Sequence, residues 1–150
     1  MANCSDNRAV YTSRDTCMAV CAALPSGSVG DDIGNSVGCR LHNAILALDT
    51  GEPELHCPVA GPGGSDTCGS DCDGYCVLMR STCPVAFKED FESNADCVRA
   101  CRTLPSPDQP FDVTQNSGPS VNCRLWHVSA ATLDPGTHCP HAAGAAPCAQ

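Results

Sequence analysis

Apolar residues recur at helical spacing in several short segments of the chain, and polar loops separate these segments. In residues 14–24 and 94–104, cysteines and aliphatic side chains lie three or four positions apart, which predicts two short helices. Ser13 and Ser93 directly precede these segments and are typical helix-capping residues. A Leu-Pro pair should end each helix, because proline disfavours the helical conformation at the residue before it.

A second pair of helices is predicted over residues 40–49 and 124–133, most clearly by the sequence RLHNAILALD. The preceding loops, residues 26–38 and 105–121, are rich in Gly, Ser, Pro and Asp and should lie on the surface. Little of the chain has the period of two that is typical of strands. The pattern therefore predicts a mainly α fold of short helices and long loops.

One more helix is predicted over residues 70–83, which we call the leading helix because it precedes the helix over 94–104. Ser70 or Asp71 should cap it, and Pro84 should end it. Its cysteines at positions i, i+4 and i+11 fall along one stripe of the helix: Cys72, Cys76 and Cys83.

The chain repeats itself. Residues 13–27 match 93–107 through Cys-x3-Cys and Leu-Pro-Ser, and residues 38–68 match 122–148 through Cys-Arg-Leu and His-Cys-Pro. Six cysteines align in order: Cys4 with Cys83, Cys17 with Cys97, Cys21 with Cys101, Cys39 with Cys123, Cys57 with Cys139, and Cys68 with Cys148. This self-similarity predicts two modules that diverged from one cysteine-rich unit.

The two predicted modules, residues 1–69 and 70–150, are unequal. The first has only residues 1–5 where the second has its leading helix. Either the chain was cut there, or the first module lacks this helix, or a neighbouring molecule supplies one. The carboxyl end stops where a further leading helix would begin, so we expect a longer array or head-to-tail self-association.

Composition places the protein in an oxidising compartment. Fourteen of 150 residues are cysteine, whereas there are only one Trp, two Tyr and three Phe. Such a chain needs disulfides to supplement a small core, so we expect a small disulfide-rich fold at the cell surface or outside the cell. No apolar run is long enough to span a bilayer. No signal sequence is present, so the chain should be a mature form or a piece of a longer one.

We expect the cysteines to form disulfides rather than metal sites, because no Cys-x2-Cys pair occurs and their number is even. An antiparallel hairpin of the leading helix and the Cys-x3-Cys helix suggests the pairs Cys83–Cys97, Cys4–Cys17 and Cys76–Cys101. The expected disulfide cysteines are Cys4, Cys17, Cys21, Cys39, Cys57, Cys68, Cys72, Cys76, Cys83, Cys97, Cys101, Cys123, Cys139 and Cys148.

Charge and motifs argue against several classes of function. The formal net charge of −9 should repel phosphate backbones, so nucleic acid is not an expected partner. A Gly-x-Ser-x-Gly nucleophile motif is absent, and paired cysteines leave no reactive thiol. We therefore expect no catalytic residues, no enzyme activity and no cofactor.

The histidines are the candidates for a metal or haem site. His56 and His138 align across the repeat, each directly before a cysteine, whereas His42 and His127 lie one position out of register. His141 stands alone. The alternative is that His-Cys-Pro forms a turn beside a disulfide, with the imidazole bonded to backbone. Likewise, the aligned Arg40 and Arg124 should bind carbonyl groups or a nearby aspartate rather than a ligand.

These motifs resemble a known repeat. Its marks here are Tyr-Cys with a following Cys over residues 75–83, Cys-x3-Cys over 97–101, Cys-Arg-Leu-x-His over 123–127 and His-Cys-Pro-His-Ala over 138–142. They resemble a cysteine-rich repeat, often in tandem, of exported proteins and lipoproteins from myxobacteria and related bacteria. The resemblance implies no established activity. The first module departs from the pattern with Asn43 and Val59 in place of two histidines.

Together these features favour a non-enzymatic extracellular structural or adhesive protein, a subunit or segment of a surface fibre or layer that assembles head to tail. One alternative is an extracellular metal- or haem-binding redox protein that uses paired histidines. A further alternative is a secreted module that binds glycans or another surface protein.

Overall fold

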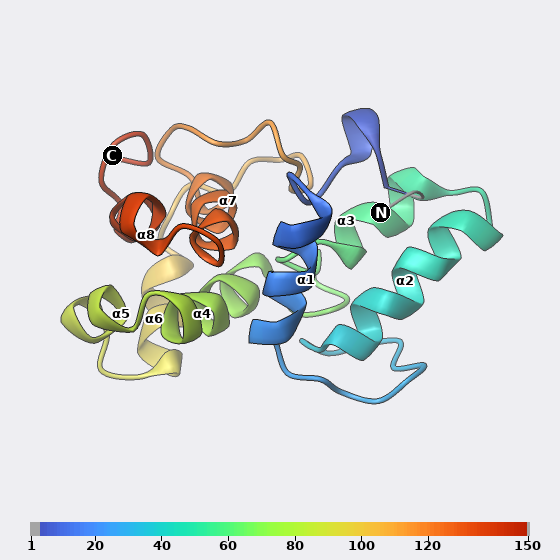
Figure 1. Cartoon of the computed structure of the whole chain (residues 1–150), viewed down its shortest axis with the longest axis horizontal. Coiled ribbons are helices and arrows are strands. Elements are labelled where there is room, and N and C mark those ends of the chain that lie inside the picture. Colours follow the sequence, from blue (N-terminus) through green and yellow to red (C-terminus); the bar gives the residue numbers. More distant parts are fainter. Residues whose placement is uncertain (1–3, 150) are drawn as a thin grey trace.

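The computed structural model describes residues 4–149, and residues 1–3 and 150 lie outside the described part. Within residues 4–149 the chain forms helices and no strand, as the pattern predicts (Figure 1). The helices are η1 Asp6–Arg8, α1 Arg14–Ala23, α2 Val37–Asp49, α3 Pro53–Ala60, α4 Asp71–Thr82, α5 Pro84–Asp90, α6 Asn94–Cys101, α7 Val121–Ala131 and α8 Pro135–Ala143.

Serine caps begin the helices that the sequence predicts. In α1, α2, α4, α6 and α7 the serine before the first residue accepts a hydrogen bond from the backbone N–H three positions on. Ser70 and Asp73 form a full capping box at the start of α4. The predicted caps Ser13, Ser70 and Ser93 are thereby confirmed.

Besides the short η1, three α-helices of residues 4–149 were not predicted: α3, α5 and α8. Each begins with proline at its first turn, where the missing N–H would have no partner inside the helix in any case. A second proline, Pro58 in α3 and Pro140 in α8, follows within the helix. The sequence therefore suggested turns, and the expected His-Cys-Pro turn is wrong because these residues lie in α3 and α8.

In the second module, α4 lies at the centre and packs against α5, α6, α7 and α8. Leu78, Met79, Leu125 and Val128 are fully buried in this core. The Tyr75 hydroxyl donates a hydrogen bond of 3.0 Å to the Ala142 carbonyl, which ties α4 to α8. The leading helix is therefore the element around which the second module packs.

The first module has no such central helix in the described residues. Helix α2 packs against α3, while α1 packs against α4 and α7 of the second module. Figure 1 shows α1 between the α2–α3 pair and the group of α4 to α8. Val20 of α1 and Leu24, which directly follows the helix, accordingly belong to the second module's core.

Six disulfides form within the described residues, and two of the first module match two of the second. The pairs are Cys4–Cys57, Cys39–Cys68, Cys72–Cys101, Cys76–Cys97, Cys83–Cys139 and Cys123–Cys148. Cys4–Cys57 corresponds to Cys83–Cys139, and Cys39–Cys68 corresponds to Cys123–Cys148, in the alignment of the repeat. Many disulfides are compatible with an extracellular protein.

The expected pairings need correction. Three are wrong: Cys83–Cys97, Cys4–Cys17 and Cys76–Cys101. The antiparallel hairpin itself is confirmed, since α4 and α6 are joined by two bridges in antiparallel order. Its register differs because α5 intervenes and turns Cys83 toward α8. The expectation that every cysteine forms a disulfide is also wrong, because Cys17 and Cys21 are free thiols.

The matched arginines bind backbone carbonyls, one of the two roles expected for them. Buried Arg40 donates hydrogen bonds to the carbonyls of Gly61 and Pro62 just after α3. Arg124 donates to the carbonyl of Ala143 at the end of α8. Each arginine thus binds carbonyl groups at the C-terminal end of the next helix in the chain. None of the helices in residues 4–149 is long and apolar enough to cross a membrane.

The carboxyl of Asp71, the first residue of α4, is largely buried, and its Oδ1 atom has no hydrogen-bond partner. Burial and the nearby Asp66 raise its pKa to about 6, although Arg40 acts in the opposite direction. A pKa raised by folding means that the native state binds this proton more tightly than the unfolded chain. The stability it gives is full below about pH 4 and is lost as the pH rises through about 6.

Replacing Asp71 with asparagine should therefore stabilise the protein at pH 7.5 by about 2 kcal/mol. At pH 4 the variant and the parent should differ by less than about 0.5 kcal/mol, since the parent is then protonated. Urea unfolding at both pH values measures this difference. Equal effects at pH 4 and pH 7.5 would show that Asp71 acts through packing rather than charge.

Candidate functional site

Cys17 and Cys21 lie one turn apart on the same face of α1, and both are half-buried. Side chains four positions apart on a helix have β-carbons about 5–6 Å apart. A disulfide requires about 3.5–4.5 Å between β-carbons. The two thiols therefore cannot form a disulfide with each other within an intact α1. Both are available to a partner that packs against this face of the helix.

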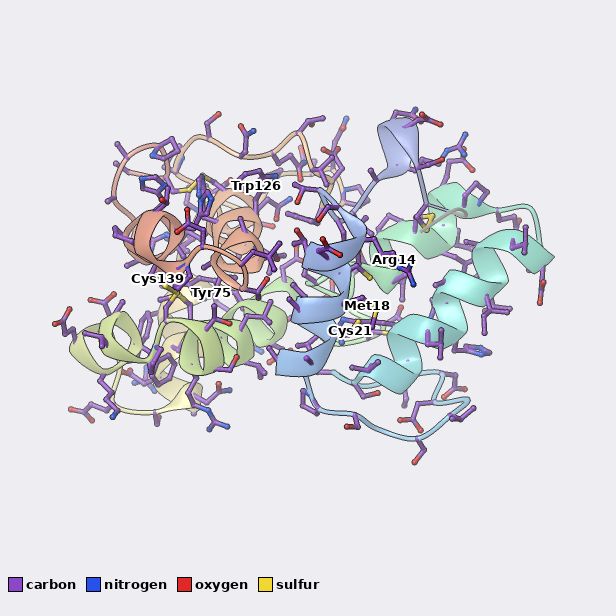
Figure 2. All side chains as sticks on the ribbon, in the orientation of Figure 1. Arg14, Met18, Cys21, Tyr75, Trp126 and Cys139 are labelled. Atoms are coloured by element: carbon purple, nitrogen blue, oxygen red, sulfur yellow. A yellow bond between two sulfur atoms is a disulfide. The ribbon has the colours of Figure 1, made fainter. Side chains whose placement is uncertain are left out.

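Beside them is an apolar groove of about 330 Å³ between α1 and α2, which we call the α1–α2 groove. Figure 2 shows Met18 and Cys21 on the side of α1 that faces α2. The groove is lined by Cys4, Val10, Tyr11, Cys17, Met18, Cys21, Val37, Arg40, Leu41, Ala44 and Ala60. The lining is almost entirely apolar, so it suits an apolar surface rather than a sugar or a charged ligand.

The second module shows what occupies the matched place. Cys17 and Cys21 align with Cys97 and Cys101, which are bridged to the leading helix α4. Leu41 of α2 aligns with Leu125 of α7; Leu41 is 51% exposed, whereas Leu125 is 0% exposed under α4. In the alignment of the repeat, the α1–α2 groove thus corresponds to the place that α4 occupies in the second module.

The two thiols differ in acidity. A hydrogen bond from the Cys21 thiol stabilises the Cys17 thiolate and lowers the pKa of Cys17 to about 7. The same interaction, together with burial, raises the pKa of Cys21. A thiol with a pKa near neutrality is the most effective attacking group in thiol–disulfide exchange. Cys17 is therefore the first thiol of the pair to react with a disulfide.

A second cluster lies between α7 and α8. His127 comes from α7, while His138 and His141 lie one turn apart on α8. Ring nitrogens of the three imidazoles lie within 4.8 Å of one another. His127 is buried and the other two are half-buried, so the cluster lies at the edge of the core.

Hydrogen bonds fix the orientation of the His127 ring. Its Nε2 lies 3.2 Å from the Asn116 carbonyl oxygen, which can only accept, so Nε2 is the protonated nitrogen. Its Nδ1 lies 2.9 Å from Nδ1 of His138. Burial lowers the pKa of His127, and the two neighbouring histidines act in the same direction. His127 is therefore neutral, with the lone pair of Nδ1 directed at His138.

The structure brings together two of the four candidate histidines, His127 and His138. The other two, His42 and His56, belong to no group of three metal-ligating side chains in the described part of the chain. His141 is the residue that the sequence interpretation missed. Its spacing of three from His138 places both on one face of a helix, but the prolines of this short segment indicate a turn rather than a helix.

The matched place in the first module has other residues. Asn43 replaces His127 and binds Nδ1 of His56 through its Oδ1 atom at 3.0 Å. Val59 replaces His141. The first module therefore keeps the helix pair without the cluster, so the histidines are not needed to hold two such helices together.

Comparison with known proteins finds a match to a family model over part of the chain. Residues 1–71 match the family model described as the BfoA family C-terminal domain. The match covers the first module and the start of α4. No curated protein and no solved structure matches the chain.

Proposed function

We propose that this protein is a non-enzymatic extracellular structural module, completed by a cysteine-bearing helix from a neighbouring module. Modules would join head to tail through disulfides and so build a fibre or layer at the cell surface. The observation that supports this proposal is the unpaired Cys17–Cys21 set beside the α1–α2 groove. The equivalent cysteines of the second module hold the leading helix.

The helix that fits the groove has a defined chemistry. It carries two cysteines four residues apart and an apolar face, as α4 does with Tyr75, Leu78 and Met79. The antiparallel order of the bridges in the second module predicts which thiols join. The donor's first cysteine should pair with Cys21 and its second with Cys17, as Cys72 pairs with Cys101 and Cys76 with Cys97.

Closing the two bridges requires an oxidant. Each new bond between two thiols releases two protons and two electrons, and a small disulfide such as oxidised glutathione accepts them. Two such molecules are reduced to four thiols for each donor helix captured. The Cys17 thiolate attacks the oxidant first, and the donor thiol then displaces the small thiol.

A peptide with the sequence of residues 70–82 tests this proposal, because it contains Cys72 and Cys76 and no other cysteine. In a glutathione redox buffer the folded protein should gain the peptide mass less four hydrogens. Peptide mapping should find the Cys21–Cys72 and Cys17–Cys76 bridges.

The matched control is the same peptide with Tyr75, Leu78 and Met79 replaced by serine, which keeps both cysteines but removes the apolar face. It should be captured far less, because the groove no longer buries it. Equal capture of both peptides would contradict the proposal, as would a covalent dimer of the protein through Cys17 or Cys21 in place of the adduct.

Native material tests the assembly itself. On a non-reducing gel it should form a ladder that collapses to one band on reduction, and Cys17→Ser with Cys21→Ser should remove the ladder. Free monomer alone in native, non-reduced material would contradict head-to-tail assembly. Capture of the peptide without a ladder would restrict the donor helix to the same polypeptide.

A further inference from the structure

The three histidines between α7 and α8 have the donor set of a metal site. We infer that His127, His138 and His141 bind a divalent transition-metal ion of the zinc and copper class. The inference is independent of the proposed assembly, because the cluster lies in the second module and shares no residue with the α1–α2 groove. Three neutral imidazoles plus a water molecule form a common coordination sphere for zinc.

The spacing of the ring nitrogens suits one ion. Two imidazole ligands of a tetrahedral zinc ion, each about 2.0 Å from the metal, have nitrogens about 3.3 Å apart. The two Nδ1 atoms of His127 and His138 are already 2.9 Å apart, and the third ring lies within 4.8 Å. Adjacent ligands on a single ion fit this spacing. Axial ligands on opposite faces of a haem iron, about 4 Å apart, do not.

The surroundings of His127 are those of a metal ligand. Its Nε2–H donates to the Asn116 carbonyl, which is the usual outer partner of a metal-binding histidine and leaves Nδ1 free to coordinate. Trp126 donates its Nε1–H to the Val113 carbonyl and contacts the His127 ring, with centroids 4.7 Å apart. A bound ion replaces the proton between the two facing Nδ1 atoms, and that proton moves to Nε2 of His138.

His141 supplies a second, independent sign of a ligand. Its Nδ1 atom is buried and has no hydrogen-bond partner, although buried polar atoms are nearly always paired. Its ring lies edge-on to that of His127, with centroids 4.8 Å apart. A metal ion held by this cluster gives the third imidazole a partner, and the exposed edge of the cluster leaves one coordination position for water.

The first module serves as a built-in comparison. It has the same helix pair, but Asn43 and Val59 stand where the second has His127 and His141. The substitutions His127→Asn and His141→Val therefore give the second module residues that this helix pair already accommodates. They remove two of the three ligands and introduce only side chains that already pack at the equivalent positions of the first module.

Titration calorimetry of the untagged protein with Zn²⁺ tests the inference. The parent should bind one ion per chain, and the double variant should bind at least about 100-fold more weakly. The matched control is His42→Asn, which removes a histidine outside the cluster and should leave the affinity unchanged. Far-UV circular dichroism and the unchanged disulfide masses establish that each variant is folded.

A second readout uses Trp126, the only tryptophan of the chain. Cu²⁺ held by the cluster lies close to this ring and should quench its fluorescence with the stoichiometry found for Zn²⁺, and removal of the Cu²⁺ with excess EDTA should reverse the quenching. Equal Zn²⁺ affinity of the parent and the double variant would overturn the inference. Loss of affinity in His42→Asn, or Cu²⁺ binding without quenching of Trp126, would also overturn it.

Discussion

Replacing both Cys83 and Cys139 with serine is expected to lower the free energy of unfolding by about 4 kcal/mol. This bridge joins the end of α4 to α8 across a sequence separation of 56 residues. It is the only disulfide in the described chain that links the α4–α6 hairpin to the α7–α8 pair. Its loss therefore frees a long loop in the unfolded chain that no other bridge closes.

The bridge Cys76–Cys97 provides the control. Both of its cysteines lie between Cys72 and Cys101 in the sequence. Cys72 and Cys76 are four positions apart, as are Cys97 and Cys101. Replacing Cys76 and Cys97 with serine opens a loop of about ten residues and should cost about 2.5 kcal/mol. Guanidinium unfolding monitored by Trp126 fluorescence measures both variants. An equal loss for the two, or a larger loss for the nested pair, would contradict the loop argument.

Local sequence signals were sufficient to predict five helices. In the segments of α1, α4 and α6, a predicted serine cap precedes a run with helical spacing, and both features act within a few residues. For α2 and α7 the spacing alone predicted a helix, and each begins three residues earlier than predicted, after a serine cap in the expected loop. Helices α3 and α8 were missed because proline within a short segment normally indicates a turn. They form because each packs against a longer neighbour, α2 or α7, and this packing offsets the missing hydrogen bond.

The partners of the cysteines could not be predicted in the same way. Cys83 appeared to face the hairpin, but α5 inserts after it, and its partner Cys139 comes from a helix that was not expected. The repeat alignment nevertheless contained usable information. Two pairs of aligned cysteines pair alike in the two modules, so Cys4–Cys57 would have followed once Cys83–Cys139 was known.

For the candidate sites, too, local features could be predicted from the sequence, whereas contacts between distant segments could not. The unequal count of cysteines, six in the first module and eight in the second, was visible in the sequence. That Cys17 and Cys21 are thereby left unpaired follows only from the bridges that form elsewhere. The histidine cluster needed the packing of α7 on α8, since two of its members lie in a helix that the sequence did not indicate.

The unequal modules also predict unequal costs for the same substitution at aligned positions. Leu125→Ala should lower the free energy of unfolding by about 3 kcal/mol, because this side chain is fully buried beneath α4 and its removal leaves a cavity. Leu41→Ala should cost less than about 0.5 kcal/mol, because half of the Leu41 side chain is already in contact with water. Urea unfolding measures both.

Capture of a donor helix should raise the cost of Leu41→Ala and leave the cost of Leu125→Ala unchanged. Once the peptide of residues 70–82 is bridged to Cys17 and Cys21, Leu41 becomes covered as Leu125 is. Leu41→Ala should then cost more than about 1 kcal/mol, whereas the cost of Leu125→Ala should stay the same. If Leu41→Ala remained neutral in the bridged adduct, the peptide would be attached through its cysteines without lying in the α1–α2 groove. The cost of Leu41→Ala in the bridged adduct therefore distinguishes a helix packed in the groove from one attached only through its disulfides.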